Sequence, residues 1–431
     1  MSTLPAPDAP SPAAGPSVVV RSVPIDADDP LLAYLPAGLP HDELLSWVRR
    51  GEGLVGWGAA MTFEAAGEGR FREAEAWWRE LTRRAVVRDD VQRAGSGLVC
   101  FGSFPFASDS AERARIVVPS TIIGRRDGHT WLTTVSLEPQ LSILQSPSLA
   151  TAPEPPVDVA FADGAVSPAS YAHAVAEAVQ RIAAGEVDKV VLARDLVATA
   201  SAPIDPRWLL RRLAERYENT WVFSVAGLVG ATPELLVRRD KGLITSRVLA
   251  GTIRRTGDDA KDLTLAASLA RSSKDLEEHE YAVRSVAEAL APHCSSMNVP
   301  EAPFVLHLPN VMHLATDVAA VSADDASSLT LAAALHPSAA VGGTPTARAV
   351  ELIGELEHMD RGRYAGPVGW MDAHGDGAWG IALRSGALDP QDSSQITLYA
   401  GCGIVAGSDP ESEVAESDAK LVPMRDALTS R

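Results

Sequence analysis

The sequence of 431 residues has no uninterrupted apolar run of the roughly 18 residues that a membrane span needs. Its first residues, MSTLPAPDAPSPAAGP, lack the basic start and apolar segment of a secretory signal, so we expect a cytoplasmic protein. The three cysteines, Cys100, Cys294 and Cys402, are too scattered to support a disulfide framework or a zinc site. Positive charge is also scarce. The net charge of −18 argues against general binding to nucleic acid or to an anionic membrane.

Apolar residues make up 46% of the chain, which is enough to bury a large core. Residues 1–16 consist mostly of Pro, Ala and Ser and are predicted to be a disordered tail. A second stretch of this kind, at 145–168, is predicted to be a linker. The chain is therefore divided into an N-terminal αβ scaffold segment, 17–145, and a catalytic domain, 165–431.

Hydrophobic periodicity and turn residues predict a helix around 71–88 in the first segment. In the second they predict a helix that has Ser167 as N-cap and Pro168 at its first position and stops at Gly185. Predicted strands lie at 54–63, 97–106, 115–126, 187–200, 220–227, 234–239, 243–251, 313–321, 366–373, 378–388 and 394–405. Because successive hairpins replace regular strand–helix alternation, we expect an α+β fold: large antiparallel or mixed sheets packed as a sandwich, with helices outside.

Lys189 and Glu234 are candidate proton-transfer residues. Alternation places Lys189 on one strand face with Val187, Val191 and Ala193, and burial there would favour a neutral amine able to act as a base. An amine that reaches water from the strand edge is an equally good interpretation. Partial burial would raise the pKa of Glu234, which makes it a candidate proton donor; the alternative is a solvated acid at a turn.

Two predicted helices carry candidate metal ligands. Glu413, Glu416 and Lys420 share one side of a final helix, and two acids on one face suit Mg²⁺. The alternative is an exposed Glu416–Lys420 ion pair, which would contribute only a few tenths of a kcal/mol. Glu278 lies on an earlier helix, 272–293, beside small residues that leave room for a ligand, although such charged runs are usually solvated.

The glycines that precede the final helix allow a different class of protein. Gly401 and Gly403 could hold a phosphate, as in a Mg²⁺-dependent nucleotide or phosphate enzyme. The sequence lacks a Walker lysine, an aspartate nucleophile motif and a dinucleotide fingerprint, which argues against that class. Arg384 is predicted to share strand parity with Gly380 and to face Tyr399 on a paired strand, where it could grip a carboxylate; an ordinary surface arginine is the alternative.

A series of motifs extends in order over about residues 165–428: KVVLAR, TPELL, AGT, KDLEEHE, HLATDV, LHPSAAVGGTP, GPVGW, ALRSGAL and AGCGIV followed by SEVAES. Together they resemble the chorismate-utilising enzymes, and most closely the isochorismate synthases. The resemblance implies an isomerase that converts chorismate reversibly to isochorismate with Mg²⁺ as cofactor. It also implies a monomer with a small-molecule substrate and no nucleic-acid or membrane partner.

The resemblance also implies roles for single residues. Lys189 matches the base that deprotonates water for attack at C2, and Glu234 matches the acid that protonates the departing C4 hydroxyl. Glu278 and Glu416 match the ligands of Mg²⁺, with Glu413 acting through water. The implied substrate contacts are Gly251, Thr252, His313, Ala340, Arg384, Tyr399, Gly401 and Lys420.

Related reactions remain as alternatives. Lys189 disfavours anthranilate synthase, but aminodeoxychorismate synthases also carry a lysine there. Ala340 stands where lyase-type relatives commonly have threonine, which favours isomerisation without pyruvate release, with salicylate synthase as the leading alternative. The sequence leaves open whether the product serves menaquinone or siderophore synthesis.

Overall fold

The computed structural model describes residues 18–137, 147–309 and 311–429, apart from the side chains of Lys274 and Glu278. The predicted disordered tail, 1–16, lies outside these residues. The helices are α1 (Arg70–Arg84), α2 (Pro168–Ala183), α3 (Pro206–Arg216), α4 (Asp259–Leu269), α5 (Ser273–Leu290), α6 (Ser328–Leu335), α7 (Thr346–Glu357) and α8 (Pro410–Thr429), with short 3-10 helices η1 (Leu31–Tyr34), η2 (His41–Glu43) and η3 (Ala291–His293).

Strands β1 to β21 make up the rest of the regular structure. They are β1 (Val19–Ile25), β2 (Leu44–Arg49), β3 (Glu52–Ala65), β4 (Val86–Asp89), β5 (Val99–Ser103), β6 (Ala114–Arg126), β7 (His129–Ser136), β8 (Ala160–Asp163), β9 (Lys189–Thr199), β10 (Trp221–Val225), β11 (Leu228–Thr232), β12 (Leu235–Asp240), β13 (Leu243–Arg254), β14 (Cys294–Asn298), β15 (Phe304–His307), β16 (Val311–Ser322), β17 (Gly343–Thr344), β18 (Pro367–Asp372), β19 (Gly377–Ile381), β20 (Ser385–Leu388) and β21 (Gln395–Ile404).

Hydrogen bonds join these strands, within the described ranges, into one 21-stranded sheet. Its pairings are antiparallel, apart from the parallel pairing of β1 with β4. Strands of the two predicted segments pair directly: β2 with β10, and β5 with β18. The two segments therefore share one sheet, and the boundary at 145–165 stays a prediction.

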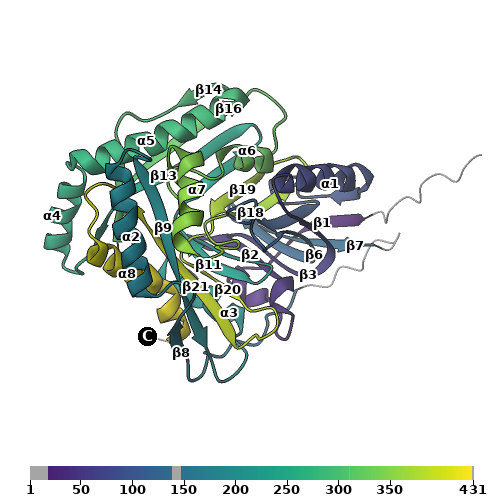
Figure 1. The fold of residues 1–431 in the computed structure, drawn as a ribbon. Coiled ribbons are helices and arrows are strands. Elements are labelled where there is room, and N and C mark those ends of the chain that lie inside the picture. The colour runs from purple at the N-terminus through teal and green to yellow at the C-terminus, as the bar shows by residue number, and fades with distance from the viewer. Residues whose placement is uncertain (1–17, 138–146, 310, 430–431) are drawn as a thin grey trace, which may run out of the picture.

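The buried core is layered in the way the α+β prediction requires. One apolar cluster joins residues of β2, β5, β10 and β18, such as Trp47, Phe101, Phe223 and Trp370, so sheet faces pack on each other. Two other clusters place helices against strands. Helices α2 and α7 pack on β9, and α8 packs on β21, so these helices lie outside the sheet (Figure 1). The predicted mixed fold with a large antiparallel sheet is confirmed.

Local sequence signals gave several element boundaries correctly. The Ser167 hydroxyl accepts a hydrogen bond from the Ser170 amide at the start of α2, and Gly185 follows its end with a φ of 79°.

The predicted helix at 71–88 was too long: α1 ends at Arg84, and Val86–Asp89 forms β4 because that segment pairs with the distant strand β1. Part of the predicted linker is also a strand, β8, which pairs with β9.

None of the helices in the described ranges has both the length and the apolar character needed to cross a membrane.

Candidate active site

The site is built on β9, a strand held from both sides. It pairs with β21 from Val190 to Thr199, and with β17 at Lys189. A buried ion pair beneath it, Arg361 with Glu357, adds two anchors: Arg361 donates to the Val191 carbonyl at 2.6 Å, and Glu357 accepts from the Ala193 amide at 2.7 Å. These bonds to the main chain fix the strand from which Lys189 projects.

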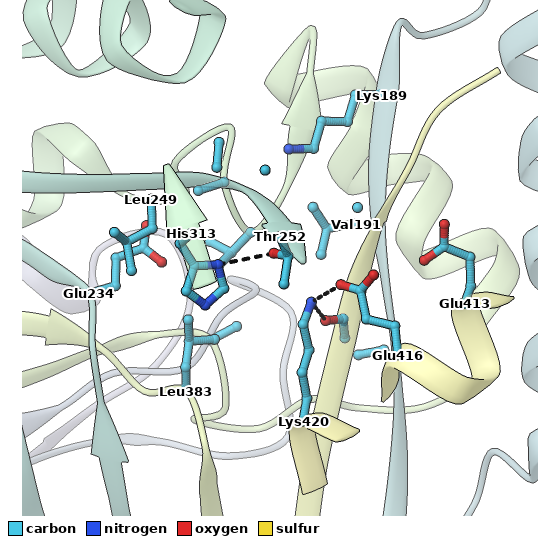
Figure 2. Close-up of a pocket in the computed structure, with 18 of the residues that line it drawn as sticks. Lys189, Val191, Glu234, Leu249, Thr252, His313, Leu383, Glu413, Glu416 and Lys420 are labelled. Carbon is cyan, nitrogen blue, oxygen red and sulfur yellow. Dashed lines mark hydrogen bonds and ion pairs between the residues drawn. The ribbon is translucent and has the colours of Figure 1, made fainter. Parts of the chain in front are cut away.

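A cavity of about 200 Å³ opens beside this strand. Lys189, Val191 and Ala193 line it together, as strand alternation predicts. The other predicted site residues on its wall are Glu234, Gly251, Thr252, His313, Ala340, Arg384, Gly401, Glu413, Glu416 and Lys420. Figure 2 shows Lys189, Glu234 and Glu416 at different sides of this cavity. Residues separated by more than 200 positions in the sequence thus meet in one site.

Glu234 lies in the short connection between β11 and β12 and is 6% exposed. Its main chain is fixed because its amide donates to the Thr232 hydroxyl at 3.2 Å and its carbonyl accepts from the Ile381 amide at 3.2 Å. Burial raises the pKa of this carboxyl from 4.5 to about 8, against the opposing effect of Lys189, Arg384 and Lys420. The group is therefore mostly protonated at neutral pH and has a proton to donate.

His313 and Thr252 face each other across paired strands β13 and β16. The Thr252 hydroxyl lies 3.0 Å from Nδ1 of His313, while Nε2 is buried with no hydrogen-bond partner in the described part of the chain. Burial lowers the pKa of this imidazole to about 3, helped by Arg384 and Lys420, so the ring is neutral. A neutral ring with one nitrogen committed and one unpaired is suited to a polar contact with a bound substrate.

A bulge at Gly251 shapes this wall. The register of β13 against β16 shifts between Ala250 and Thr252, and Gly251 itself has a φ of 76°. Leu249 to Thr252 therefore line the cavity consecutively, which a regular strand does not allow. A side chain at Gly251 would adopt a strained backbone conformation and crowd Asp275 at 3.2 Å.

The opposite end of the cavity is charged. Lys420 Nζ lies 2.7 Å from Glu416 and donates to the Gly401 carbonyl at 2.9 Å. Burial opposes ionisation of Glu416, but Lys420 outweighs it and the pKa of Glu416 is lowered. Burial likewise opposes the charge of Lys420, yet Cys402 and Glu416 raise its pKa overall. The ion pair is half-buried on the cavity wall, not fully exposed as in the alternative interpretation.

The geometry predicted around Arg384 was wrong in two respects. The predicted strand 378–388 breaks into β19 and β20, and Arg384 lies between them with a φ of 50°, so strand parity does not position it. Its buried guanidinium nevertheless lines the cavity. Tyr399 does not line the cavity, because the ring of Tyr364 stacks on it at 5.1 Å and takes its place on the wall. Sequence reasoning missed Tyr364, which lies in an irregular segment without periodicity.

The acidic end has a donor set that fits Mg²⁺. Glu413 and Glu416 come from one face of α8, and their carboxylate oxygens lie within 4.8 Å of each other. Glu416 is held in the ionised form, and carboxylate oxygens are the ligands that Mg²⁺ prefers. The third predicted ligand, Glu278, belongs to α5, but its side chain lies outside the described part of the structure. The assignment of Glu278 and Glu416 as ligands remains a prediction.

Comparisons with known proteins agree on one family. A family model described as "Chorismate binding enzyme" matches residues 12–429. The chain is 31% identical over 403 residues to isochorismate synthase MenF of Bacillus subtilis, covering 87% of this chain and 85% of the relative. It is 32% identical over 441 residues to the salicylate biosynthesis isochorismate synthase of Pseudomonas aeruginosa, covering 96% and 91%. The crystal structure of DhbC from Bacillus anthracis superposes with a TM-score of 0.74 at 30% identity, covering 91% of this chain and 97% of that one. The chain belongs to the family of chorismate-binding enzymes.

Proposed function

We propose that the protein is an isochorismate synthase, an isomerase that converts chorismate reversibly to isochorismate. The observation that carries the proposal is that Lys189 and Glu234 line the same cavity, in which burial raises the pKa of Glu234 to about 8. The reaction adds one water at C2 of the ring and removes one water from C4, so it needs a base and an acid at different sides of the substrate. Named relatives of this chain, from Bacillus subtilis and Pseudomonas aeruginosa, support the same reaction.

In the forward direction Lys189 accepts a proton from water while the water oxygen forms its bond to C2. The ring double bonds shift and the bond from C4 to its hydroxyl oxygen breaks. Glu234 donates its proton to that oxygen, which leaves as water. Because the overall change is near symmetric, the reverse reaction uses the same two groups with exchanged roles. The buried position of Glu234 is what keeps its proton available at neutral pH.

Cations of the cavity wall would hold the two carboxylates of chorismate. Arg384 is buried on this wall, and its planar guanidinium suits bidentate contact with a carboxylate. Lys420 keeps its charge beside Glu416. Both are needed because a dianionic substrate approaches a protein of net charge −18. His313 Nε2, buried and unpaired among the described residues, would contact the ring region, held in orientation by Thr252.

Mg²⁺, when bound, would supply positive charge to hold the ring carboxylate. Glu416 and Glu278 would hold the ion, and Glu413 would act through water. The oxygen donors of Glu413 and Glu416 support this assignment. We further propose that the enzyme works as a cytoplasmic monomer.

Two alternatives are less well supported. The cavity wall at Ala340 offers a methyl group where a lyase-type relative would present a hydroxyl, which favours isomerisation over salicylate formation. A phosphate enzyme needs a glycine loop, whereas Gly401 and Gly403 lie inside β21. A Cβ at Gly401 would come 2.9 Å from the Leu192 carbonyl, so close strand packing explains this glycine.

The test is to incubate purified protein with chorismate and Mg²⁺ and to separate the products by chromatography, with and without EDTA. We expect isochorismate in equilibrium with chorismate, no pyruvate, and loss of turnover in EDTA that added Mg²⁺ restores. Salicylate and pyruvate as main products would replace the isomerase with a lyase. An unchanged substrate in all samples would contradict the proposed function.

A further inference from the structure

Cys402 has no role in the proposed reaction, although it lies between two glycines of the cavity wall. Its side chain is 1% exposed. Strand alternation in β21 turns Gly401 and Gly403 toward the cavity and Cys402 toward the opposite face, where α8 packs. The thiol therefore lies between the strand and the helix that carries the acidic residues.

The sulfur of Cys402 lies close to two carboxylates at this position. Its Sγ and the carboxylate oxygens of Glu413 and Glu416 all lie within 4.8 Å of one another. The thiol donates a hydrogen bond to the main-chain carbonyl of Glu413 at 3.6 Å. This hydrogen bond holds the sulfur against the turn of α8 that carries Glu413.

A donor set of one sulfur and two carboxylates suits a different cation from Mg²⁺. Mg²⁺ takes oxygen ligands in near-octahedral geometry, whereas a thiolate selects softer ions such as Zn²⁺ and Cd²⁺. Zn²⁺ binds sulfur at about 2.3 Å and carboxylate oxygen at about 2.0–2.2 Å, usually with four ligands. Three protein atoms this close together need only small side-chain adjustments to share such an ion.

We propose that Cys402, Glu413 and Glu416 form a second cation site, selective for a thiophilic divalent ion such as Zn²⁺ or Cd²⁺. Binding forms bonds from the ion to the sulfur and to the carboxylate oxygens. The S–H bond breaks with both electrons kept by sulfur, the proton passes to water, and nothing is oxidised or reduced. The ammonium of Lys420 contacts Oε1 of Glu416, which leaves Oε2 for the ion.

The site has a functional consequence that rests on the proposed function. Glu413 and Glu416 serve both cations, so an ion drawn toward Cys402 withdraws them from the cavity side of α8. A thiophilic ion therefore inhibits turnover at concentrations far below those at which Mg²⁺ acts, because thiolate-containing sites favour such ions strongly.

Cadmium titration of the metal-free full chain tests the site without relying on turnover. The readout is the ultraviolet charge-transfer band of a cadmium thiolate. Because the chain has three cysteines, the parent is compared with Cys402→Ala and with a Cys100→Ala, Cys294→Ala double variant in which Cys402 is the remaining thiol. We expect the band in the parent and in the double variant, and at least a tenfold weaker cadmium affinity in Cys402→Ala, since even outer-shell changes cost about 10–100-fold.

Equal cadmium affinity in the parent and in Cys402→Ala would overturn the proposal, as would a band that is missing from a folded double variant. If the double variant does not fold, Cys402→Ser provides the same comparison, because a hydroxyl keeps the polar group but binds soft cations poorly. The kinetic arm measures zinc inhibition, which should be weaker in Cys402→Ala. Absence of turnover in every protein, together with an intact cadmium band, would refute the isochorismate synthase proposal and leave the metal site standing.

Discussion

Glu234 and Glu416 are the same type of side chain at two ends of one cavity, and the protein gives them opposite protonation states. Glu234 is buried and forms no ion pair with the residues that the structure describes, and burial raises its pKa to about 8. Glu416 is half-buried, but Lys420 lies 2.7 Å away and the pKa of Glu416 is lowered. Direct contact with an ammonium thus outweighs burial at one end, while cations at longer range do not outweigh it at the other. This difference fits the roles proposed for them, with Glu234 as the proton donor and Glu416 as a metal ligand.

Removing the base should have the largest effect on turnover. In Lys189→Ala, we expect isochorismate formation to fall by at least about 10²–10⁴-fold, because the variant loses the proposed proton acceptor for water. Chorismate binding, measured by calorimetry with Mg²⁺ present, should be largely retained. Lys241→Ala, at the exposed turn between β12 and β13, is the matched control. A near-normal rate in Lys189→Ala would refute the base assignment.

The variant Glu234→Gln lacks the proposed proton donor, and its rate should fall by a similar factor of about 10²–10⁴. The pH dependence gives a sharper readout. The forward reaction needs protonated Glu234, so kcat/KM of the parent should fall as the pH rises through about 8. The residual activity of Glu234→Gln should lack this alkaline decrease, since an amide does not titrate. An unchanged profile in the variant would show that another group is the acid.

Replacing Glu416 should change the Mg²⁺ requirement more than the proton-transfer steps. In Glu416→Gln, the Mg²⁺ concentration that gives half-maximal rate should rise about 10–100-fold, because a charged ligand is replaced by a neutral one. Glu411→Gln is the control, since Glu411 is exposed on the same helix and lies outside the cavity wall. Equal Mg²⁺ requirements for the two variants would remove Glu416 from the metal site.

The raised pKa of Glu234 also predicts that the free energy of unfolding depends on pH. The group binds its proton up to about pH 8 when folded and only up to its ordinary value of 4.5 when unfolded. Its contribution to the free energy of unfolding is therefore fully present below pH 4.5 and is lost as the pH rises to about 8. Relative to Glu234→Gln, the parent should lose about 1.4 kcal/mol per pH unit in this window, measured by denaturant unfolding. A pH-independent difference would contradict the raised pKa.

Regular elements made part of this site predictable from the sequence. Alternation in one strand placed Lys189, Val191 and Ala193 on the cavity side, and helical spacing placed Glu413, Glu416 and Lys420 on one face of α8. Such periods depend only on local backbone geometry.

Irregular backbone made the rest unpredictable. Arg384 reaches the cavity from a left-handed kink, and Gly251 does so through a bulge, so neither follows strand parity. Tyr364 lies in an irregular segment, so no helical or strand periodicity points to it. The proximity of Cys402 to Glu413 and Glu416 depends on how α8 packs on β21, which no local pattern encodes. Long-range pairing of β4 with β1 similarly shortened the helix predicted at 71–88.

The most direct test of this account is the protonation state of Glu234 at neutral pH. Infrared difference spectroscopy between the parent and Glu234→Gln isolates the carbonyl stretch of a protonated carboxyl group. We predict that the parent shows this band at pH 7 and loses it as the pH rises through about 8, while the variant lacks it throughout. A parent spectrum with only ionised carboxylate at pH 7 would contradict the assignment of Glu234 as the proton donor.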